Sequence, residues 1–487
     1  MGDSFRPVLQ LLTGRTLGQV ATFLMPVVLA RVFGQTEFGT YKQVFLIYAT
    51  LWAVAQVGMA ECLYYFVPRE PNAAGEFVGT SILSLGALGG VCLAALTLFD
   101  TQVAAWLANP GLAPHMPKLG LFVMLMLVAA VLEISMIASH RYRQAAATYL
   151  ATDIGRAVLL VVPAAIWGSL GALLWGAVIF AALRVVATVA ALARLFGASL
   201  RPQWQRLREQ ARYALPFAAA VVVQTVTMQF HKYAVSYTFG PALFAIYAVG
   251  CLQIPLVSHT ASSASDVLMV RMADAYRRGE GEHALRSWHE TTRKLALILC
   301  PMAAVIVAAG DDVIALLFTQ KYARAAPIFK MAAGLVVLGI LQTDGVLRVF
   351  AKTHFILGLN SMRLSLTAIA IWPALSVFGL VGGMLISVVA MAVGKVVAIA
   401  QIGRLMHVRL AGVLPWGQLG AMLAVAALAA GAGSLFRSHA GLPVFASLLT
   451  TTSVTLTLYL GLAVVFGLVR RAEIRAALQW LRAPAQS

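Results

Sequence analysis

Charged residues are scarce in this chain of 487 residues, where they make up 11% of the sequence against about 25% in ordinary soluble proteins. The four cysteines, Cys62, Cys92, Cys251 and Cys300, lie in apolar segments without CxxC spacing, which argues against a disulfide framework or a metal site. The sequence also has no GxxxxGK[ST] motif for ATP hydrolysis and no loop long enough for a catalytic domain. These absences argue against an ATPase, a zinc protein or a soluble enzyme.

Apolar residues take the place of the missing charge, at 61% of the sequence. A helix needs about 20 apolar residues to cross the hydrocarbon core of a bilayer. On this basis the sequence predicts an all-α integral membrane protein with 14 transmembrane helices and no removable signal peptide. The predicted spans lie near residues 7–31, 42–66, 76–99, 118–138, 146–168, 169–194, 213–238, 243–271, 292–310, 327–349, 354–378, 380–403, 412–435 and 443–469.

The net charge of +18 is dispersed among the loops between these spans, which favours a membrane topology signal over nucleic-acid binding. Most loop Lys and Arg residues fall on the side that would hold both termini. The positive-inside rule assigns that side to the cytoplasm. We therefore predict that both termini are cytoplasmic.

A sequence frame recurs in the two halves of the chain. Phe33-Gly34, Phe38 and Tyr41 match Phe239-Gly240, Phe244 and Tyr247, 206 positions later. Internal duplication is typical of secondary transporters, and here both copies start from the same side, so we predict a parallel repeat. The predicted divisions are a first lobe of six spans at 1–196, a cytoplasmic amphipathic linker at 197–212, a second lobe of six spans at 213–407, two extra spans at 408–469 and a cytoplasmic tail at 470–487.

Basic residues lie deep within several predicted spans. A cation near the bilayer centre costs about 2.5–3.5 kcal/mol, so five would cost on the order of 12–17 kcal/mol. That cost is as large as a typical total folding stability of about 5–15 kcal/mol, so these side chains must be hidden from lipid. We predict that they surround a wet central cavity that accepts a diphosphate, with Lys232 in the outer half as a further candidate. The five are Arg15, Arg156, Arg184, Arg363 and Lys395.

Acidic residues also lie in the spans, and two interpretations of them stay open. They form ion pairs with the cations, as Asp153 and Arg156 would at i, i+3 spacing, or they exchange H⁺ or Na⁺ during transport. The candidates are Glu61, Glu133, Asp153, Asp266 and Asp344. No cofactor is expected beyond such an ion.

The opening of each lobe resembles a known family. Leu29-Ala30-Arg31-Val32-Phe33-Gly34 and Phe38-Gly39-Thr40-Tyr41 in the first half, with Tyr213 to Pro216, Phe239-Gly240 and Tyr247 in the second, are similar to the Wzx-type polysaccharide flippases of the MOP exporter superfamily. The 14-span count is also similar to that of the lipid II flippase MurJ.

This resemblance implies a function and a location. Such flippases move undecaprenyl-diphosphate-linked oligosaccharides from the inner to the outer leaflet of the bacterial inner membrane by alternating access. The implied partners are that lipid-linked substrate, membrane lipids, and polysaccharide polymerase and chain-length proteins, with no nucleic acid. Polar and aromatic side chains in the spans are candidates for sugar contacts: Gln43, Gln56, Tyr64, Tyr65, Gln224, Thr225, Thr227, Gln229, Tyr237, Tyr247, Asn360 and Ser361.

Three alternatives remain. A MurJ-like lipid II flippase shares the frame, and loss of viability on deletion would support it. A multidrug exporter of the same superfamily would favour acids over cations in its cavity. A membrane subunit of a polysaccharide synthase would require catalytic acids in a sizeable loop, which the sequence lacks.

Overall fold

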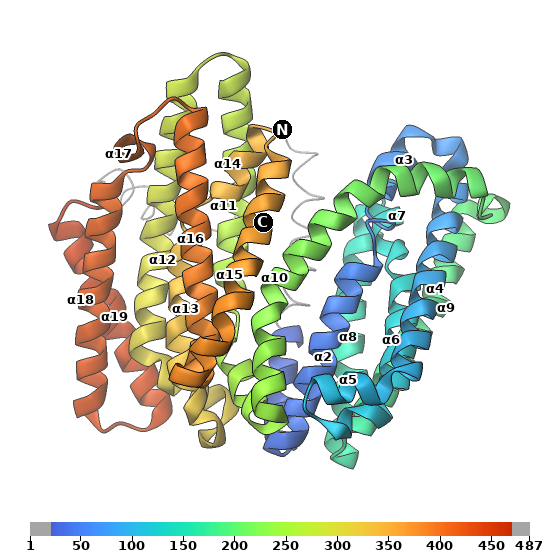
Figure 1. The fold of residues 1–487 in the computed structure, drawn as a ribbon, viewed down its shortest axis with the longest axis horizontal. Coiled ribbons are helices and arrows are strands. Elements are labelled where there is room, and N and C mark those ends of the chain that lie inside the picture. The colour runs from blue at the N-terminus through green and yellow to red at the C-terminus, as the bar shows by residue number, and fades with distance from the viewer. Residues whose placement is uncertain (1–20, 470–487) are drawn as a thin grey trace. The chain divides into compact units, whose positions relative to one another are not determined.

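The computed structural model of the chain describes residues 21–469, which contain helices and no strand. The chain divides into two compact units, Met1–Ala248 and Val249–Ser487 (Figure 1). Among the described residues, 11 helices are long and apolar enough to cross a membrane. The chain is therefore a multi-pass, all-helical membrane protein, as its composition predicts.

The first unit begins, in its described part, with the short apolar helix Ala21–Val32. In this unit α4 packs on α6, α6 on α9, and α8 on α9. Its elements are α2 (Gln35–Ala55), α3 (Leu63–Arg69), η1 (Pro71–Ala73), α4 (Ala74–Leu98), α5 (Asp100–Trp106), η2 (Pro110–His115), α6 (Met116–Ala129), α7 (Val131–Ala138), α8 (Tyr142–Trp167), α9 (Leu170–Phe196), η3 (Gly197–Ser199) and most of α10 (Trp204–Gly250).

In the second unit, α12 is the central helix, since it contacts α11, α13, α18 and α19. The last two helices, drawn in red in Figure 1, also pack on each other. The elements of this unit are α11 (Pro255–Arg277), α12 (Gly281–Phe318), η4 (Gln320–Ala325), α13 (Ala326–Leu338), α14 (Thr343–Val349), α15 (Thr353–Phe378), α16 (Leu380–Leu405), α17 (Leu410–Val413), α18 (Trp416–Ala440) and α19 (Val444–Val465).

Three of the 14 predicted spans have no counterpart among the 11 helical segments of the described residues that are long and apolar enough to cross a membrane. The first begins outside the described residues. The second is divided between α2 and α3, and the eighth between the end of α10 and α11. The count of 14 and the lobe repeat therefore stay predictions.

Spans 2, 4, 8 and 10 are each divided between two helices. Span 4 is divided into α6 and α7 at Ala130, and span 10 into α13 and α14 at residues 339–342. Irregular backbone inside a membrane requires partners for its freed polar groups. Lys395 is such a partner at the break in span 10, because its Nζ donates a hydrogen bond to the Leu341 carbonyl at 2.7 Å.

Tight turns at Gly168 and Gly379 join α8 to α9 and α15 to α16. Both glycines adopt the positive φ that residues with a Cβ avoid, at 59° and 58°. This conformation reverses the chain within one or two residues, so the two helices of each pair pack against each other.

The predicted linker at 197–212 is not a segment separate from span 7, because α10 begins at Trp204 and continues to Gly250. Its first turn pairs with acids on α4 and in the turn before α4. Arg206 Nε donates to Glu76 at 3.0 Å, and its Nη1 donates to Glu70 at 3.1 Å. The hydrogen bond with Glu76 is the main reason that the pKa of Arg206 is raised above its ordinary value.

The repeated Phe-Gly frame is part of the core. Phe38 is 0% exposed and Tyr247 is 0% exposed. The two copies also meet within the first unit, because a side chain at Gly39 would collide with the Pro241 carbonyl. The frame that carries the family resemblance thus serves helix packing.

Candidate functional site

Arg184, which lies on α9, forms an ion pair with Glu133 in the first turn of α7. Its Nη2 donates to both carboxylate oxygens, each at 2.9 Å. The Arg184 side chain is 13% exposed and that of Glu133 is 3% exposed, so the pair is shielded from its surroundings. The break between α6 and α7 lies directly before Glu133, in the same segment of the span.

Arg156 lies on α8 and uses a single nitrogen for two contacts. Its Nη2 donates to Asp153 Oδ1 at 2.9 Å and to the Thr22 hydroxyl at 2.8 Å. The i, i+3 pairing of Asp153 with Arg156 that the sequence predicts is therefore confirmed.

In the second unit, Arg363 on α15 and Lys395 on α16 share one carboxylate, that of Asp344 at the start of α14. The distances to Asp344 Oδ1 are 3.9 Å from Arg363 Nη2 and 3.8 Å from Lys395 Nζ. Lys395 also donates to the Thr343 hydroxyl at 3.1 Å. The guanidinium of Arg363 lies directly over Gly394, where a side chain would have no room.

The two clusters differ in charge. Two cations face two carboxylates in the first unit, whereas two cations share one carboxylate in the second. Arg363 is 5% exposed, and its Nε and Nη2 have no hydrogen-bond partner among the described residues. A buried guanidinium with free donors and excess positive charge is suited to an anion with several oxygens, such as a phosphate.

The remaining predicted cations contribute less. Lys232 donates to Gln229 on the same helix at 2.9 Å, as a locally satisfied polar group would. Arg15 lies outside the described residues. In the first unit, Arg156 and Arg184 each pair with their own acid. In the second unit, Arg363 and Lys395 lie around one shared acid, Asp344.

Two predicted acids lie apart from these clusters. Glu61 is exposed in the irregular turn between α2 and α3, and Gln56 reaches it when the amide is oriented to satisfy both neighbours. Asp266 is exposed on α11, and no ion pair reaches it from the described part of the chain. The acids that do pair with cations are Asp153, Glu133 and Asp344.

Two of the candidates for sugar contact are structural. Gln43 is fully buried and donates to the Leu107 carbonyl at 2.9 Å. Tyr247 is fully buried, with its hydroxyl 2.5 Å from His231 Nδ1. Neither side chain is open to a substrate, so the sequence-based expectation was wrong for both.

The sequence analysis did not predict a third ion-pair cluster, which joins α12, α13, α18 and α19. Arg437 Nε and Nη1 donate to Asp312 at 2.9 Å and to Asp311 at 3.0 Å, and Lys330 Nζ lies 2.5 Å from Asp311. Ser447 donates to Asp312 at 2.7 Å. The consecutive acids Asp311 and Asp312 in an apolar helix were the available signal.

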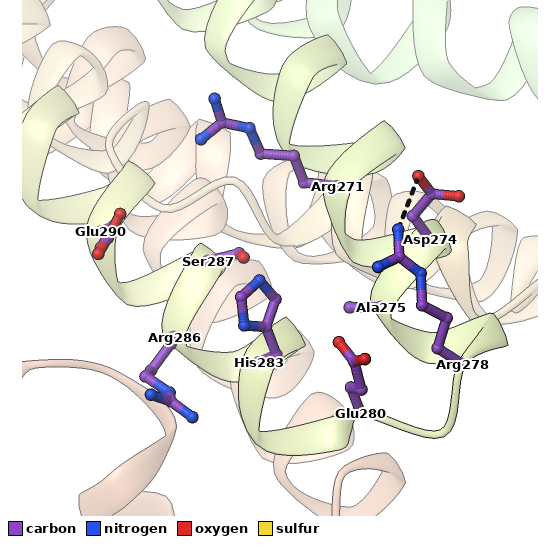
Figure 2. Close-up of a pocket in the computed structure, with 9 residues that line it drawn as sticks. All are labelled: Arg271, Asp274, Ala275, Arg278, Glu280, His283, Arg286, Ser287 and Glu290. Carbon is purple, nitrogen blue, oxygen red and sulfur yellow. Dashed lines mark ion pairs between the residues drawn. The ribbon is translucent and has the colours of Figure 1, made fainter.

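A cavity of about 390 Å³ lies between α11 and α12 near their connecting turn (Figure 2). None of the predicted site residues lines it. Its three arginines are balanced by three carboxylates, and Asp274 already pairs with Arg278. This cavity therefore lacks the excess charge of the Arg363 cluster. It is lined by Arg271, Asp274, Ala275, Arg278, Glu280, His283, Arg286, Ser287 and Glu290.

Solved structures share this fold at low sequence identity. The lipid II flippase MurJ in an inward closed conformation is 13% identical, with a TM-score of 0.75, and the match covers 95% of this chain and 98% of MurJ. An inward-facing multidrug resistance MATE family transporter of the MOP superfamily is 14% identical, with a TM-score of 0.59 and coverage of 81% and 94%. A MOP superfamily transporter from Pyrococcus furiosus is 16% identical, with a TM-score of 0.58 and coverage of 83% and 96%.

The sequence itself identifies the family. No curated protein matches the chain by sequence. Residues 28–327 match the model of a family described as polysaccharide biosynthesis protein. Since this match spans more than half of the chain, and the fold is that of the MOP superfamily transporters, the protein belongs to the polysaccharide biosynthesis protein family.

Proposed function

We propose that this protein is a flippase that moves undecaprenyl-diphosphate-linked oligosaccharides across the bacterial inner membrane, from the cytoplasmic to the outer leaflet. It works by alternating access and is not an enzyme. The family membership and the MOP fold support this proposal. Its strongest support is the excess positive charge of the cluster of Arg363, Lys395 and Asp344.

The diphosphate is the part of the substrate that Arg363 and Lys395 are suited to bind. Asp344 neutralises only one of these two cations, and Lys395 is held by the Leu341 carbonyl. Arg363 keeps two buried nitrogens without a hydrogen-bond partner among the described residues. Charge-assisted bonds from a guanidinium to phosphate oxygens would satisfy both of these donors.

The same excess charge disfavours a multidrug exporter of organic cations. A cationic drug would meet Arg363 and Lys395 with a single compensating acid, so binding would cost free energy instead of releasing it. The diphosphate of the proposed substrate is negatively charged, so these cations would attract it.

Coupling to H⁺ or Na⁺ is a further part of the proposal. Asp344 is the candidate carboxylate in the second unit, because two cations compete for it at distances longer than a direct hydrogen bond. In vesicles containing the purified protein, a pH jump or a Na⁺ gradient should change the flipping rate. An unchanged rate under both conditions would contradict coupling.

Lipid II is the second candidate substrate, because the likeness to the lipid II flippase MurJ extends over 98% of that chain. It carries the same lipid diphosphate, so the cation clusters suit both substrates. Deletion of the gene distinguishes them: a loss of viability favours lipid II, and viable cells without surface polysaccharide favour the oligosaccharide.

Replacement of Arg363 by Ala in a deletion strain tests the main proposal. We expect normal protein level in the membrane, at least a tenfold loss of polysaccharide export as for other removed charge contacts of about 1.5–3 kcal/mol, and accumulation of the lipid-linked intermediate. Arg404→Ala is the matched control, because Arg404 is exposed at the end of the neighbouring α16. Normal export by Arg363→Ala, or a collapse of its protein level, would contradict the anion-binding role.

A further inference from the structure

One face of the first turns of α10 is held against α4 in the first unit. Gln210 is fully buried, and its amide donates to the Phe77 carbonyl at 3.1 Å and to the Ser81 hydroxyl at 2.9 Å. One turn earlier, Arg206 Nε lies 3.0 Å from Glu76. These contacts define an inner face of α10 and fix the rotation of the helix about its axis.

The opposite face of these turns carries an aromatic side chain and cations. Trp204, Arg208 and Arg212 each lie two positions from a residue of the inner face, which is just over half a turn of an α-helix. All three are exposed, Trp204 by 81%. Arg201, shortly before the helix, is exposed as well. We call these four residues the basic stripe.

The length of α4 relates the basic stripe to the lipid headgroups of a membrane. The apolar helical segment Pro71–Leu98, which contains α4, has 28 residues and is therefore about 42 Å long. This length matches a bilayer together with its headgroups, about 40–45 Å, so the start of the segment lies at headgroup level. The contacts with Glu76 and Phe77 fix the first turns of α10 beside that start, at the end of the first unit that also holds α3 (Figure 1).

The arginines of the basic stripe differ from other exposed arginines in their lack of acid partners. No ion pair reaches them from the described part of the chain, and the neighbouring acid Glu209 pairs with Arg206 instead. Between α11 and α12, by contrast, Arg277 and Arg278 lie 2.8 Å and 3.7 Å from the carboxylate oxygens of Asp274. A topology signal requires only positive charge in a loop. A fixed helix face that combines a tryptophan with unpaired cations exceeds that requirement.

We infer that the basic stripe binds the headgroups of anionic phospholipids, such as phosphatidylglycerol, at the membrane surface. Arginine forms charge-assisted hydrogen bonds with phosphate oxygens, and basic clusters directly beside a membrane span attract anionic lipids. Tryptophan is enriched at headgroup level, because its ring combines an apolar body with an N–H donor. A soluble acidic partner could use the same charges, but the depth of the stripe and the exposed indole of Trp204 favour a lipid. The inference does not depend on the proposed substrate, because the stripe shares no residue with the clusters around Arg156, Arg184 and Arg363.

Lipid binding to the purified full-length protein in a neutral detergent tests the inference, with native mass spectrometry to count the bound lipids. The probes are phosphatidylglycerol and phosphatidylcholine with identical acyl chains. We expect Arg201→Gln/Arg208→Gln/Arg212→Gln to weaken phosphatidylglycerol binding by about tenfold or more, since each arginine near an anionic surface contributes about fivefold. Phosphatidylcholine binding should stay within about twofold, because this headgroup has no net charge. Trp204→Ser should weaken binding of both lipids by a similar factor, because an indole does not distinguish the charge of the headgroup.

A matched triple variant removes the same number of positive charges elsewhere. Arg277→Gln/Arg278→Gln/Arg286→Gln changes exposed arginines whose acid partners are Asp274 and Glu282, and it should leave both affinities within about twofold. Both triple variants should keep the melting temperature of the unmodified protein, because all six arginines are exposed. Equal losses of phosphatidylglycerol binding in the two variants would show that net charge attracts the lipid, and would overturn the inference. Equal affinities of the unmodified protein for the two lipids would leave a soluble acidic partner as the occupant of the stripe, and would overturn the lipid assignment as well.

Discussion

The Nη2 atom of Arg184 lies 2.9 Å from both carboxylate oxygens of Glu133, at a point where the span is broken between α6 and α7. Such an ion pair has two consequences for stability. It neutralises a cation within an apolar helix, but each partner then depends on the other for its charge balance.

Removal of Glu133 should therefore destabilise the protein. Glu133→Ala leaves the Arg184 guanidinium buried without its counter-ion, and breaking a buried pair costs about 3–5 kcal/mol. We expect a clear drop in melting temperature, measured by fluorescence-detected size exclusion after heating in detergent. Glu282→Ala is the control, because its partner Arg286 is 4.0 Å away and both side chains are exposed. Equal melting temperatures for Glu133→Ala and the unmodified protein would contradict this account.

A methyl group at Gly394 should disturb the Arg363 cluster without removing any charge. In Gly394→Ala the new Cβ would collide with Arg363 Nε and lie 2.8 Å from its Cζ, so the guanidinium must move away from Asp344. We expect polysaccharide export to fall about tenfold or more, as for a displaced charge-assisted bond. The measurement is complementation of a deletion strain at matched protein level.

Gly420→Ala provides the comparison for that experiment, since nothing lies within 4 Å of the position that its Cβ would take. Gly in a helix interior is less favourable than Ala by up to about 1 kcal/mol, so this variant should be neutral or slightly more stable. Unimpaired export by Gly394→Ala would show that the position of Arg363 is not critical.

The last two helices should depend on the Arg437 cluster for their attachment to α12. Arg437→Ala leaves two neighbouring acids, Asp311 and Asp312, with Lys330 as the remaining cation. Asp312 is 4% exposed, so we expect a loss of stability of about 3–5 kcal/mol. Limited proteolysis should then cleave the turn between α18 and α19 faster, while an unchanged cleavage rate would contradict this role.

Close packing within this helix group gives an independent test. A side chain at Gly433 would collide with the Thr455 hydroxyl and approach Ala308 Cβ to 3.0 Å, whereas Gly431 on the same helix has nothing within 4 Å. Gly433→Ala should lower the melting temperature, and Gly431→Ala should not. Similar effects of the two substitutions would argue against tight packing of α18 between α12 and α19.

The start of α10 should be held by charge. Arg206 pairs with Glu70, Glu76 and Glu209, and each of these side chains is 20–42% exposed, so salt should weaken the contacts. The raised pKa of Arg206 stabilises the folded state at every pH below the ordinary pKa of a guanidinium, so no loss is expected between pH 6 and pH 9. Arg206→Gln should lower the melting temperature by a few degrees at low salt and less at about 1 M salt. A salt-independent effect would point to packing of Arg206 on Phe77 instead.

The sequence predicted the class of fold because hydrophobic length is a local property. Runs of about 20 apolar residues require spanning helices, and the turns at Gly168 and Gly379 follow from glycine and its neighbours alone. The interruption of α13 before Thr343 was not predicted, because it depends on Lys395 reaching the Leu341 carbonyl from a helix 54 residues away.

The sequence predicted which residues belong to the candidate site, but it did not predict most of their contacts. Cations in apolar spans are costly wherever they lie, so Arg156, Arg184, Arg363 and Lys395 stand out from the sequence. Their partners are mostly distant in the chain, and only Asp153 is close enough to be assigned by helical spacing.

What the sequence by itself determined is therefore that this protein spans the membrane and holds positive charge within it. Only the tertiary structure decided how that charge is balanced, with two acids for two cations in one unit and one acid for two cations in the other. The physical reason is distance: transfer free energy adds up residue by residue along a helix, whereas a Coulomb interaction depends on side chains that folding brings within about 4 Å.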